Sequence, residues 1–205
     1  MEHLTIDIFK AMLRQALNDI KKREDEFSKL DAVIGDGDHG TAIVTALSAA
    51  VKAAENGTEF KSMLNDMGFG VMLETSGSTS TLLGAFFLGM SDCASGTALD
   101  ATGVKTMFAG GLANVEKQTQ ARKGDKTMMD ALIPAVEAMQ ESTSDDIKTL
   151  FSVAAVAAGQ GAEQTINMKA NYGRARNYGE RSIGYADSGA SSWSAIFCAF
   201  ARNND

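Results

Sequence analysis

The stretch of this sequence best suited to chemistry holds three carboxylates close together. Asp31, Asp36 and Asp38 fall within eight residues, and the last two lie in the glycine-rich run 35–40. Carboxylates this close repel one another, and a hard divalent cation with oxygen ligands is the simplest way to neutralise them. Because Mg²⁺ usually takes one or two protein carboxylates and completes its shell with phosphate oxygens and water, the cluster indicates a magnesium and phosphate site. A solvated acidic turn that caps the next helix is the alternative interpretation.

The run 35–40 also matches two other motifs on paper, and its context argues against both. It satisfies the dinucleotide-binding pattern G-x-G-x-x-G, but a helical pattern rather than a strand precedes it, and two of its variable positions are carboxylates that would repel a pyrophosphate. An EF-hand would need a bidentate glutamate eleven residues after Asp36, where Leu47 stands. Neither motif is therefore expected.

Three further stretches are candidates for phosphate contacts. The hydroxyl-rich run 76–81 precedes an apolar helical segment, so it predicts either a phosphate held at a helix start or an ordinary N-cap. The run 124–127 resembles the end of a P-loop, but Thr119 stands where that motif needs its first glycine. The arginines within 173–181 suit phosphate contacts, and pairing with the many carboxylates is the alternative.

Two single residues beside these stretches have their own interpretations. His39 either acts as a catalytic or phosphoacceptor histidine or, beside three aspartates, donates a hydrogen bond to a nucleotide or carboxylate. Met128 is either core filling or packs on a flat base. No Ser/His/Asp triad can be assembled, because His3 and His39 are the only histidines.

The elements that must position these residues are predicted to be helices. Only one proline, Pro134, occurs in the 205 residues, whereas turn-rich all-β domains usually contain more. Apolar residues recur at helical spacing in eight segments, and the sequence therefore predicts an all-α, single-domain fold over residues 1–205. The segment 170–187 has no sustained period and is expected to be a long functional loop. The predicted helices span about 5–30, 39–55, 58–75, 80–94, 100–119, 127–141, 145–168 and 188–202.

Composition narrows the partners and the compartment. The net charge of −7 argues against nucleic acid or an anionic membrane surface as a partner, so any phosphate must be held locally. Two cysteines form neither a disulfide framework nor a zinc set, and no apolar stretch is long enough to span a membrane. We expect a cytoplasmic protein.

Four separated motifs in one order resemble the nucleotide-binding L subunit of dihydroxyacetone kinase, in particular the phosphoenolpyruvate-dependent type. They are the aspartate run 31–40, the Gly-Ser-Thr run 77–87, the Gly-Asp-Lys-Thr-Met run 124–134 and the arginine-bearing run 173–184. The resemblance covers about residues 5–200 and implies a barrel of eight antiparallel helices that holds ADP or ATP with magnesium at one end. Two family prolines are missing, at 80–81 and 187–189, so nucleotide retention is expected to differ from other members.

The resemblance also implies a set of site residues. Two magnesium ions would be bound by Asp31, Asp36 and Asp38. The nucleotide would be lined by the loop and helix-start residues His39, Gly40, Thr41, Ala42, Ser78, Thr79, Thr119, Met128, Arg174, Asp187, Ser188 and Gly189. No side chain is assigned a catalytic role, because phosphoryl transfer needs positioning and charge neutralisation more than an acid or base.

The same resemblance implies the partners. ADP would stay on the subunit, accept a phosphoryl group from a phosphohistidine M subunit and pass it to dihydroxyacetone on a separate K subunit. The alternatives are an ATP-dependent kinase for a related ketose such as erythrulose, and a non-catalytic regulator that senses nucleotide. Homodimerisation is left open.

Overall fold

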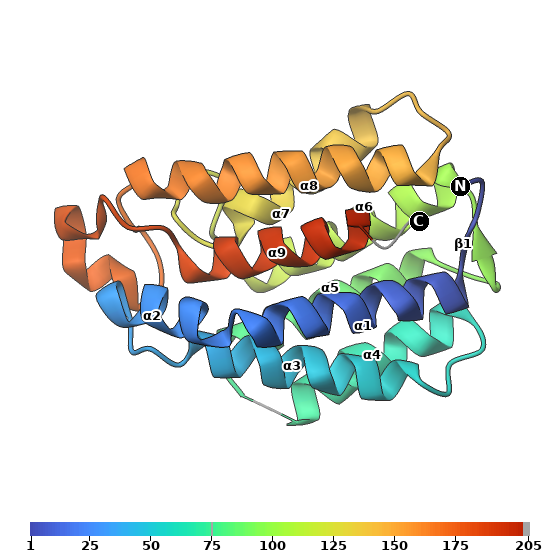
Figure 1. Cartoon of the computed structure of the whole chain (residues 1–205), viewed down its shortest axis with the longest axis horizontal. Helices are drawn as coiled ribbons and strands as arrows, with labels where there is room; N and C mark the ends of the chain where they lie inside the picture. The colour runs from blue at the N-terminus through green and yellow to red at the C-terminus, as the bar shows by residue number, and fades with distance from the viewer. Residues whose placement is uncertain (75, 203–205) are drawn as a thin grey trace.

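A ring of eight helices forms the body of the protein (Figure 1). The computed structural model describes residues 1–74 and 76–202. Over these residues, the elements in chain order are β1 (Leu4–Thr5), α1 (Ile6–Lys22), α2 (Glu24–Ile34), α3 (His39–Ala54), α4 (Phe60–Glu74), α5 (Ser78–Cys93), β2 (Ala98–Leu99), α6 (Ala101–Gln118), α7 (Met129–Glu141), α8 (Ile147–Gln164), η1 (Thr165–Asn167), η2 (Arg174–Ser182) and α9 (Ser188–Arg202).

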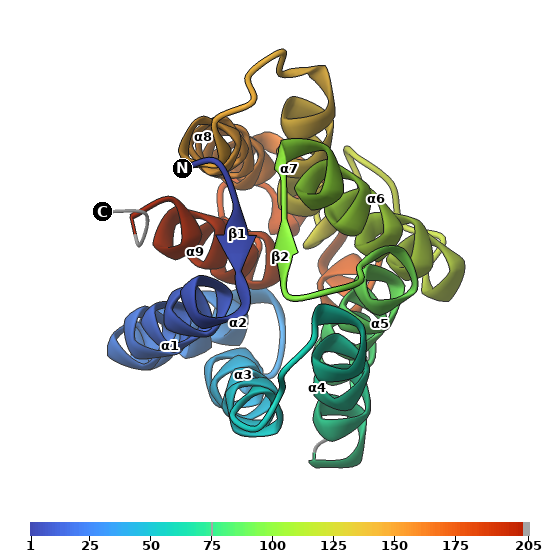
Figure 2. The same ribbon diagram turned by 90° about the vertical axis from the view of Figure 1, so that its right-hand side faces the viewer.

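The ring closes on itself, and its helices alternate in direction. Each of α1, α3, α4, α5, α6, α7, α8 and α9 packs on the next, and α9 packs on α1 (Figure 2). As a result α3, α5, α7 and α9 all begin at one end of the ring, which we call the site end (Figure 1). The opposite, far end carries β1 and β2, a short antiparallel pair that joins Leu4 to Leu99 and Thr5 to Ala98.

The predicted count of eight helices is wrong, although the all-α class is right. The helix expected over 5–30 is divided at Arg23, whose φ of −111° and ψ of 11° end α1. The chain then resumes as α2, which lies outside the ring at the site end (Figure 1). A third departure is η2, a 3₁₀ segment inside the loop expected over 170–187. The predicted end of the third helix, expected over 58–75, lies outside the described residues.

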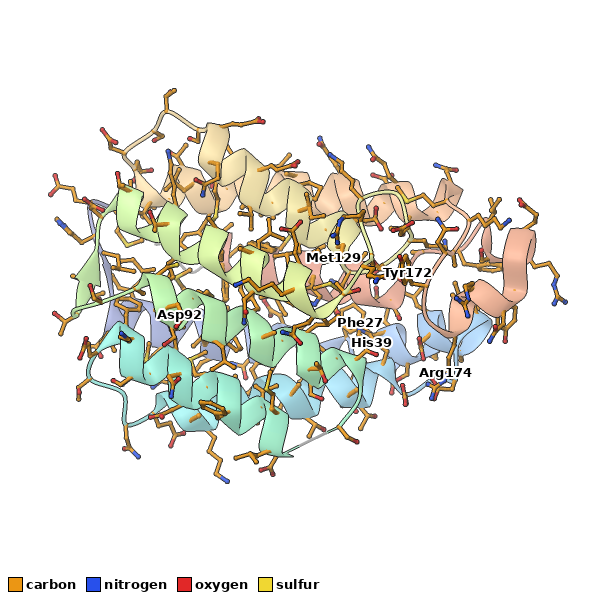
Figure 3. All side chains as sticks on the ribbon, turned by 180° about the vertical axis from the view of Figure 1, so that it is seen from behind. Phe27, His39, Asp92, Met129, Tyr172 and Arg174 are labelled. Carbon is orange, nitrogen blue, oxygen red and sulfur yellow. The ribbon has the colours of Figure 1, made fainter. Side chains whose placement is uncertain are left out.

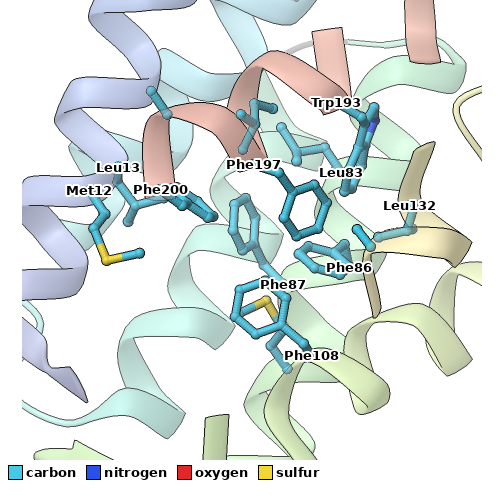
Figure 4. Packing of buried hydrophobic residues seen from close by; sticks show 14 of the residues in the cluster. Met12, Leu13, Leu83, Phe86, Phe87, Phe108, Leu132, Trp193, Phe197 and Phe200 are labelled. Atoms are coloured by element: carbon cyan, nitrogen blue, oxygen red, sulfur yellow. The ribbon is translucent and has the colours of Figure 1, made fainter. Parts of the chain in front are cut away.

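Aromatic side chains fill the centre of the ring. Phe108 packs edge-on against Phe86 and Phe151, with ring centroids 5.8 and 5.6 Å apart, and Phe197 lies beside it (Figure 4). Trp193 meets Phe86 at 5.1 Å. Such tilted pairs contribute about 0.5–1.5 kcal/mol each beyond their burial. Because these residues come from α5, α6, α8 and α9, the core ties opposite walls of the ring together and fixes where the helices begin.

No helix within 1–74 or 76–202 combines the length and the hydrophobicity that crossing a membrane requires.

Candidate metal and phosphate site

The three aspartates of the sequence motif converge at the site end. One carboxylate oxygen from each of Asp31, Asp36 and Asp38 lies within 4.8 Å of the others; Asp31 is half-buried, and the other two are exposed. Burial raises the pKa of Asp38, and the neighbouring Asp36 carboxylate raises it further. Oxygen ligands at this spacing fit a hard divalent cation such as Mg²⁺.

Local structure differs from the expected loop and explains the convergence. Asp31 lies in the last turn of α2 rather than in a loop, because that helix continues to Ile34. The chain then reverses through Gly37, whose φ is +80°, and its amide donates to the Asp31 carboxylate at 2.8 Å. This turn brings Asp36 and Asp38 back toward Asp31, and Ser188 at the start of α9 donates to Asp31 at 3.1 Å.

Arg174 closes the cluster from the opposite side. Its guanidinium forms an ion pair with Asp36 and lies 3.8 Å from an Asp38 oxygen (Figure 3). Arg174 begins η2, directly after Gly173, whose φ of +63° is in the left-handed region that favours glycine. The side chain is exposed, so the pair contributes little to stability. The ion pair nevertheless places the positive charge of Arg174 beside the three carboxylates.

His39 joins three helix starts instead of facing the aspartates. It is buried, and its Nε2 lies 2.9 Å from the Ser192 hydroxyl, which itself donates to the Gly189 carbonyl at 3.0 Å. Because that hydroxyl proton is already used, Nε2 carries the imidazole proton and Nδ1 is the acceptor, 3.4 Å from the Thr79 hydroxyl. Burial lowers the His39 pKa, so the ring is neutral at pH 7. Its contacts suit a structural link between α3, α5 and α9.

Two helices that begin at the site end, α3 and α5, lack the side-chain caps found on helices that begin at the far end. At the far end Thr5, Asp100 and Asp146 cap α1, α6 and α8 with side-chain hydrogen bonds. At the site end the N-cap residues of α3 and α5, Asp38 and Gly77, form no such bond. Because α4, α6 and α8 end at the site end, their dipoles oppose those of the helices that begin there. What these helix starts offer an anion is therefore local: the free amides of the first turn, which donate hydrogen bonds to it.

The other predicted residues lie at the starts of α3, α5, α7 and α9, directly after α6 and at the start of η2. Ser78 and Thr41 are exposed, whereas Met128 and Ser188 are buried. Gly189 lies against Met128, since a Cβ added at that glycine would be 3.3 Å from the methionine Cβ. The predicted residues at this end of the ring are His39, Gly40, Thr41, Ala42, Ser78, Thr79, Thr119, Met128, Arg174, Asp187, Ser188 and Gly189.

Gly40 has a packing role that the sequence did not indicate. A Cβ at this position would lie 2.1 Å from the Glu24 carbonyl oxygen and 2.4 Å from the Ser28 hydroxyl. Only glycine therefore lets α2 approach the first turn of α3 this closely. Thr41 adds a hydrogen bond of 3.0 Å to the Glu24 carboxylate. The crossing of α2 and α3 fixes the position of Asp31 relative to Asp36 and Asp38.

Asp187 is held in an unusual state behind the cluster. It is half-buried, and its carboxylate accepts from the Ala190 amide at 2.7 Å, which caps α9. Burial raises the Asp187 pKa to about 7, against the opposing effect of that hydrogen bond and of Lys126. The Asp187 amide donates to the Thr165 hydroxyl at 2.9 Å, so the residue also joins the end of α8 to the start of α9.

Sequence reasoning missed two buried charged residues near this end. Asp130 is 1% exposed and accepts from the amides of Gly124 and Thr127 at 2.5 and 2.8 Å. The sequence does show the capping-box spacing of Thr127 and Asp130, which indicates a helix start but not the burial of Asp130. Lys126, also 1% exposed, has no comparable signal, because an isolated lysine in a polar loop is usually solvated.

The amino-acid sequence also matches a known protein family. A family model described as the DAK2 domain matches residues 33–202, more than half of the chain. The chain belongs to the DAK2 domain family. Asp36 and Asp38 lie within the matched DAK2 domain residues, and Asp31 lies two residues before them.

Two curated DAK2 domain relatives illustrate the family. Over 190 residues the chain is 34% identical to the "PEP-dependent dihydroxyacetone kinase 1, ADP-binding subunit DhaL" of Listeria innocua, covering 89% of this chain and 91% of that one. Over 181 residues it is 33% identical to the D-erythrulose kinase of Mycolicibacterium smegmatis, covering 82% of this chain but only 30% of that one.

A solved structure shares the fold. The dihydroxyacetone kinase from C. freundii, crystallised in complex with AMP-PNP and Mg²⁺, matches with a TM-score of 0.70 and 21% identity. The match covers 94% of this chain and 33% of that one, so this chain corresponds to about a third of that larger chain.

Proposed function

We propose that this chain is the nucleotide-binding subunit of a dihydroxyacetone kinase and that residues 1–205 act as one domain. The observation that carries the proposal is the meeting of Asp31, Asp36 and Asp38 within 4.8 Å, beside the two helix starts without side-chain caps, in a DAK2 domain chain. The ADP-binding relative from Listeria innocua, matched over nearly its whole length, supports the nucleotide assignment.

In this proposal each group of residues has a separate task. Asp31, Asp36 and Asp38 hold two magnesium ions, which supply charge neutralisation between the carboxylates and the nucleotide phosphates. The amides at the starts of α3 and α5, with the hydroxyls of Ser78 and Thr79, donate hydrogen bonds to the phosphate oxygens. The remaining lining comes from the other predicted nucleotide residues, namely His39, Gly40, Thr41, Ala42, Thr119, Met128, Arg174, Asp187, Ser188 and Gly189.

The bound nucleotide would carry a phosphoryl group from a phosphohistidine on an M subunit to dihydroxyacetone on a K subunit. No side chain of this chain is assigned as an acid or base for that transfer. His39 has its Nε2 proton directed to Ser192, and its lowered pKa keeps it neutral. Arg174 lies against the cluster, which suits it to contact phosphate once magnesium occupies the aspartates.

A related ketose is the second candidate substrate, because D-erythrulose kinase of Mycolicibacterium smegmatis is 33% identical over the aligned residues. Turnover with purified partner subunits separates the alternatives. Phosphoenolpyruvate and ATP are compared as donors, and dihydroxyacetone and erythrulose as acceptors. Activity with phosphoenolpyruvate and dihydroxyacetone supports the leading proposal, whereas ATP-driven activity on erythrulose favours the second.

Replacing one aspartate tests the site directly. Asp36→Asn removes one of three charges while keeping the side-chain shape, and we expect Mg²⁺-dependent ADP affinity to fall at least tenfold, because the phosphates then face an incomplete cation site. Asp92→Asn is the matched control, since Asp92 is an exposed carboxylate on α5 well separated from Arg174 (Figure 3). Isothermal titration calorimetry measures both. Equal affinities in the two variants would remove the aspartates from the site.

A further inference from the structure

One buried lysine at the site end has no part in the proposed chemistry. Lys126 is 1% exposed, and its ammonium donates to the Thr165 carbonyl at 2.5 Å and to the Tyr185 carbonyl. Those two carbonyls are twenty residues apart in the chain, at the end of α8 and just before α9. The lysine therefore binds together the two ends of one long segment.

That segment, residues 165–187, is the loop that carries Arg174. Two other contacts close its neck: the Asp187 amide donates to the Thr165 hydroxyl at 2.9 Å, and the Gly184 amide donates to the Ile166 carbonyl at 2.7 Å. The neck is thus closed by backbone contacts within the segment and by a side chain from a different loop.

The residue before the lysine holds the same segment at a second point. The Asp125 carbonyl accepts from the Asn171 amide at 3.1 Å, and the Asp125 carboxylate accepts from the Asn171 side chain at 2.8 Å. Asn171 stands three residues before Arg174. Residues 125 and 126 together therefore fix the approach of the chain to that arginine.

The arrangement has costs that other residues would avoid. Lys126 has a φ of +61°, a left-handed conformation that glycine adopts freely, and its ammonium is taken out of water. An apolar side chain would remove the buried charge but would leave the Thr165 and Tyr185 carbonyls without this donor. These costs must be offset by the link that the Lys126 ammonium makes between the Thr165 and Tyr185 carbonyls.

We propose that Lys126 is a positioning residue for the nucleotide site: it closes the neck of the 165–187 loop and thereby holds Arg174 against the Asp36 and Asp38 carboxylates. This inference rests on the proposed function for the readout of its test. Lys126 itself does not touch the cluster; it acts through the loop, whose arginine forms the ion pair with Asp36.

The first experiment compares Lys126→Met with Lys123→Met in the full chain. Lys123 belongs to the same connection between α6 and α7, but its side chain is 56% exposed. We expect Lys126→Met to weaken Mg-ADP binding at least tenfold by calorimetry and to speed amide exchange within 165–187 alone. Lys123→Met should stay within twofold of the unmodified protein. Exchange that speeds evenly over all helices would overturn the positioning role in favour of a purely structural one.

A double-mutant cycle asks whether the lysine works through the arginine. In an Arg174→Met background, adding Lys126→Met should weaken Mg-ADP binding by less than threefold, because the residue that it positions is already absent. A full tenfold further loss would overturn the proposal. Lys126→Gln, which keeps an N–H donor without the charge, replaces Lys126→Met if the latter does not fold; if neither variant folds, Lys126 is a folding residue and the positioning role is rejected.

The starting measurement separates this inference from the proposed function. If the unmodified protein binds no Mg-ADP, the proposed function fails. If it binds Mg-ADP and Lys126→Met binds equally well, only the role of Lys126 fails.

Discussion

At the scale of single residues, burial behind the aspartate cluster sets ionisation states in opposite directions. The same loss of water contact raises the pKa of Asp187 to about 7 and lowers the pKa values of His39 and Lys126. The result is a region in which the buried histidine is neutral and the aspartate is half-protonated near pH 7.

The raised pKa of Asp187 predicts how stability depends on pH. Between its ordinary value near 3.8 and about 7, the folded protein binds a proton that the unfolded chain does not, so this residue adds stability as pH falls from 8 to 5. We expect Asp187→Asn, which can still cap α9, to lack this gain by about 2 kcal/mol. Guanidinium unfolding of both proteins in chelator, at several pH values, measures it. Parallel pH profiles would contradict the assignment.

The pH profile of Asp187→Asn has to be subtracted from that of the unmodified protein, because His39 changes stability with pH in the opposite direction. Because the pKa of His39 is lowered in the folded protein, the unfolded chain binds the extra proton. The free energy of unfolding therefore decreases as pH falls below about 6.5. Subtracting one profile from the other cancels this contribution.

What the sequence could predict at this scale depended on distance along the chain. Asp31, Asp36 and Asp38 are neighbours in sequence, so their mutual repulsion followed from spacing alone, whereas the choice between a cation and a solvated acidic turn did not. The partner of His39 is Ser192, 153 residues away, and the acceptors of Lys126 are also remote. Such contacts depend on how the ring closes, which no local pattern specifies.

At the scale of elements, the crossing of α2 and α3 decides the geometry of the site. Periodicity predicted one helix over 5–30, because the apolar positions continue through the break at Arg23. A change of helix direction leaves little trace in hydrophobic spacing when both parts are partly buried. The consequence was that Asp31 was expected in a loop, whereas α2 holds it rigidly near the Gly37 turn.

Gly40→Ala tests that crossing. The added methyl would lie 2.1 Å from the Glu24 carbonyl oxygen, so α2 must move, and we expect about 2–4 kcal/mol of destabilisation. Gly159→Ala is the matched control: it is also helical, its nearest neighbour would be the Ser194 hydroxyl at 3.8 Å, and it should stabilise slightly. Thermal or denaturant unfolding compares them. A neutral Gly40→Ala would show that α2 is not packed as described.

At the scale of the whole molecule, the alternating ring collects four helix starts at one end. The sequence correctly indicated helices throughout, and the family resemblance implied the closed barrel; periodicity alone could not supply the order of neighbours around the ring. The β1–β2 pair was also beyond prediction, since two residues per strand give no period to detect.

Ligand binding at the site end should stabilise the ring, because the proposed site draws on α2, α3, α5 and α9. With Mg²⁺ and ADP at about 100 times the dissociation constant, the gain is about 2.7 kcal/mol, or roughly 5–10 °C in Tm for a chain of this size. ADP with chelator should give almost none of it, since the phosphates would then face the bare carboxylates. Differential scanning fluorimetry provides the comparison. An equal rise without metal would show that the nucleotide binds elsewhere.

An even number of alternating helices also returns the chain to where it started. Both Met1 and the end of α9 lie at the far end, beside β1 and β2 (Figure 2). A surface tether or fluorescent label attached at either terminus would thus leave the aspartates pointing away from the attachment. Immobilised this way, all molecules would turn the site end, with its three carboxylates, toward a flowing solution.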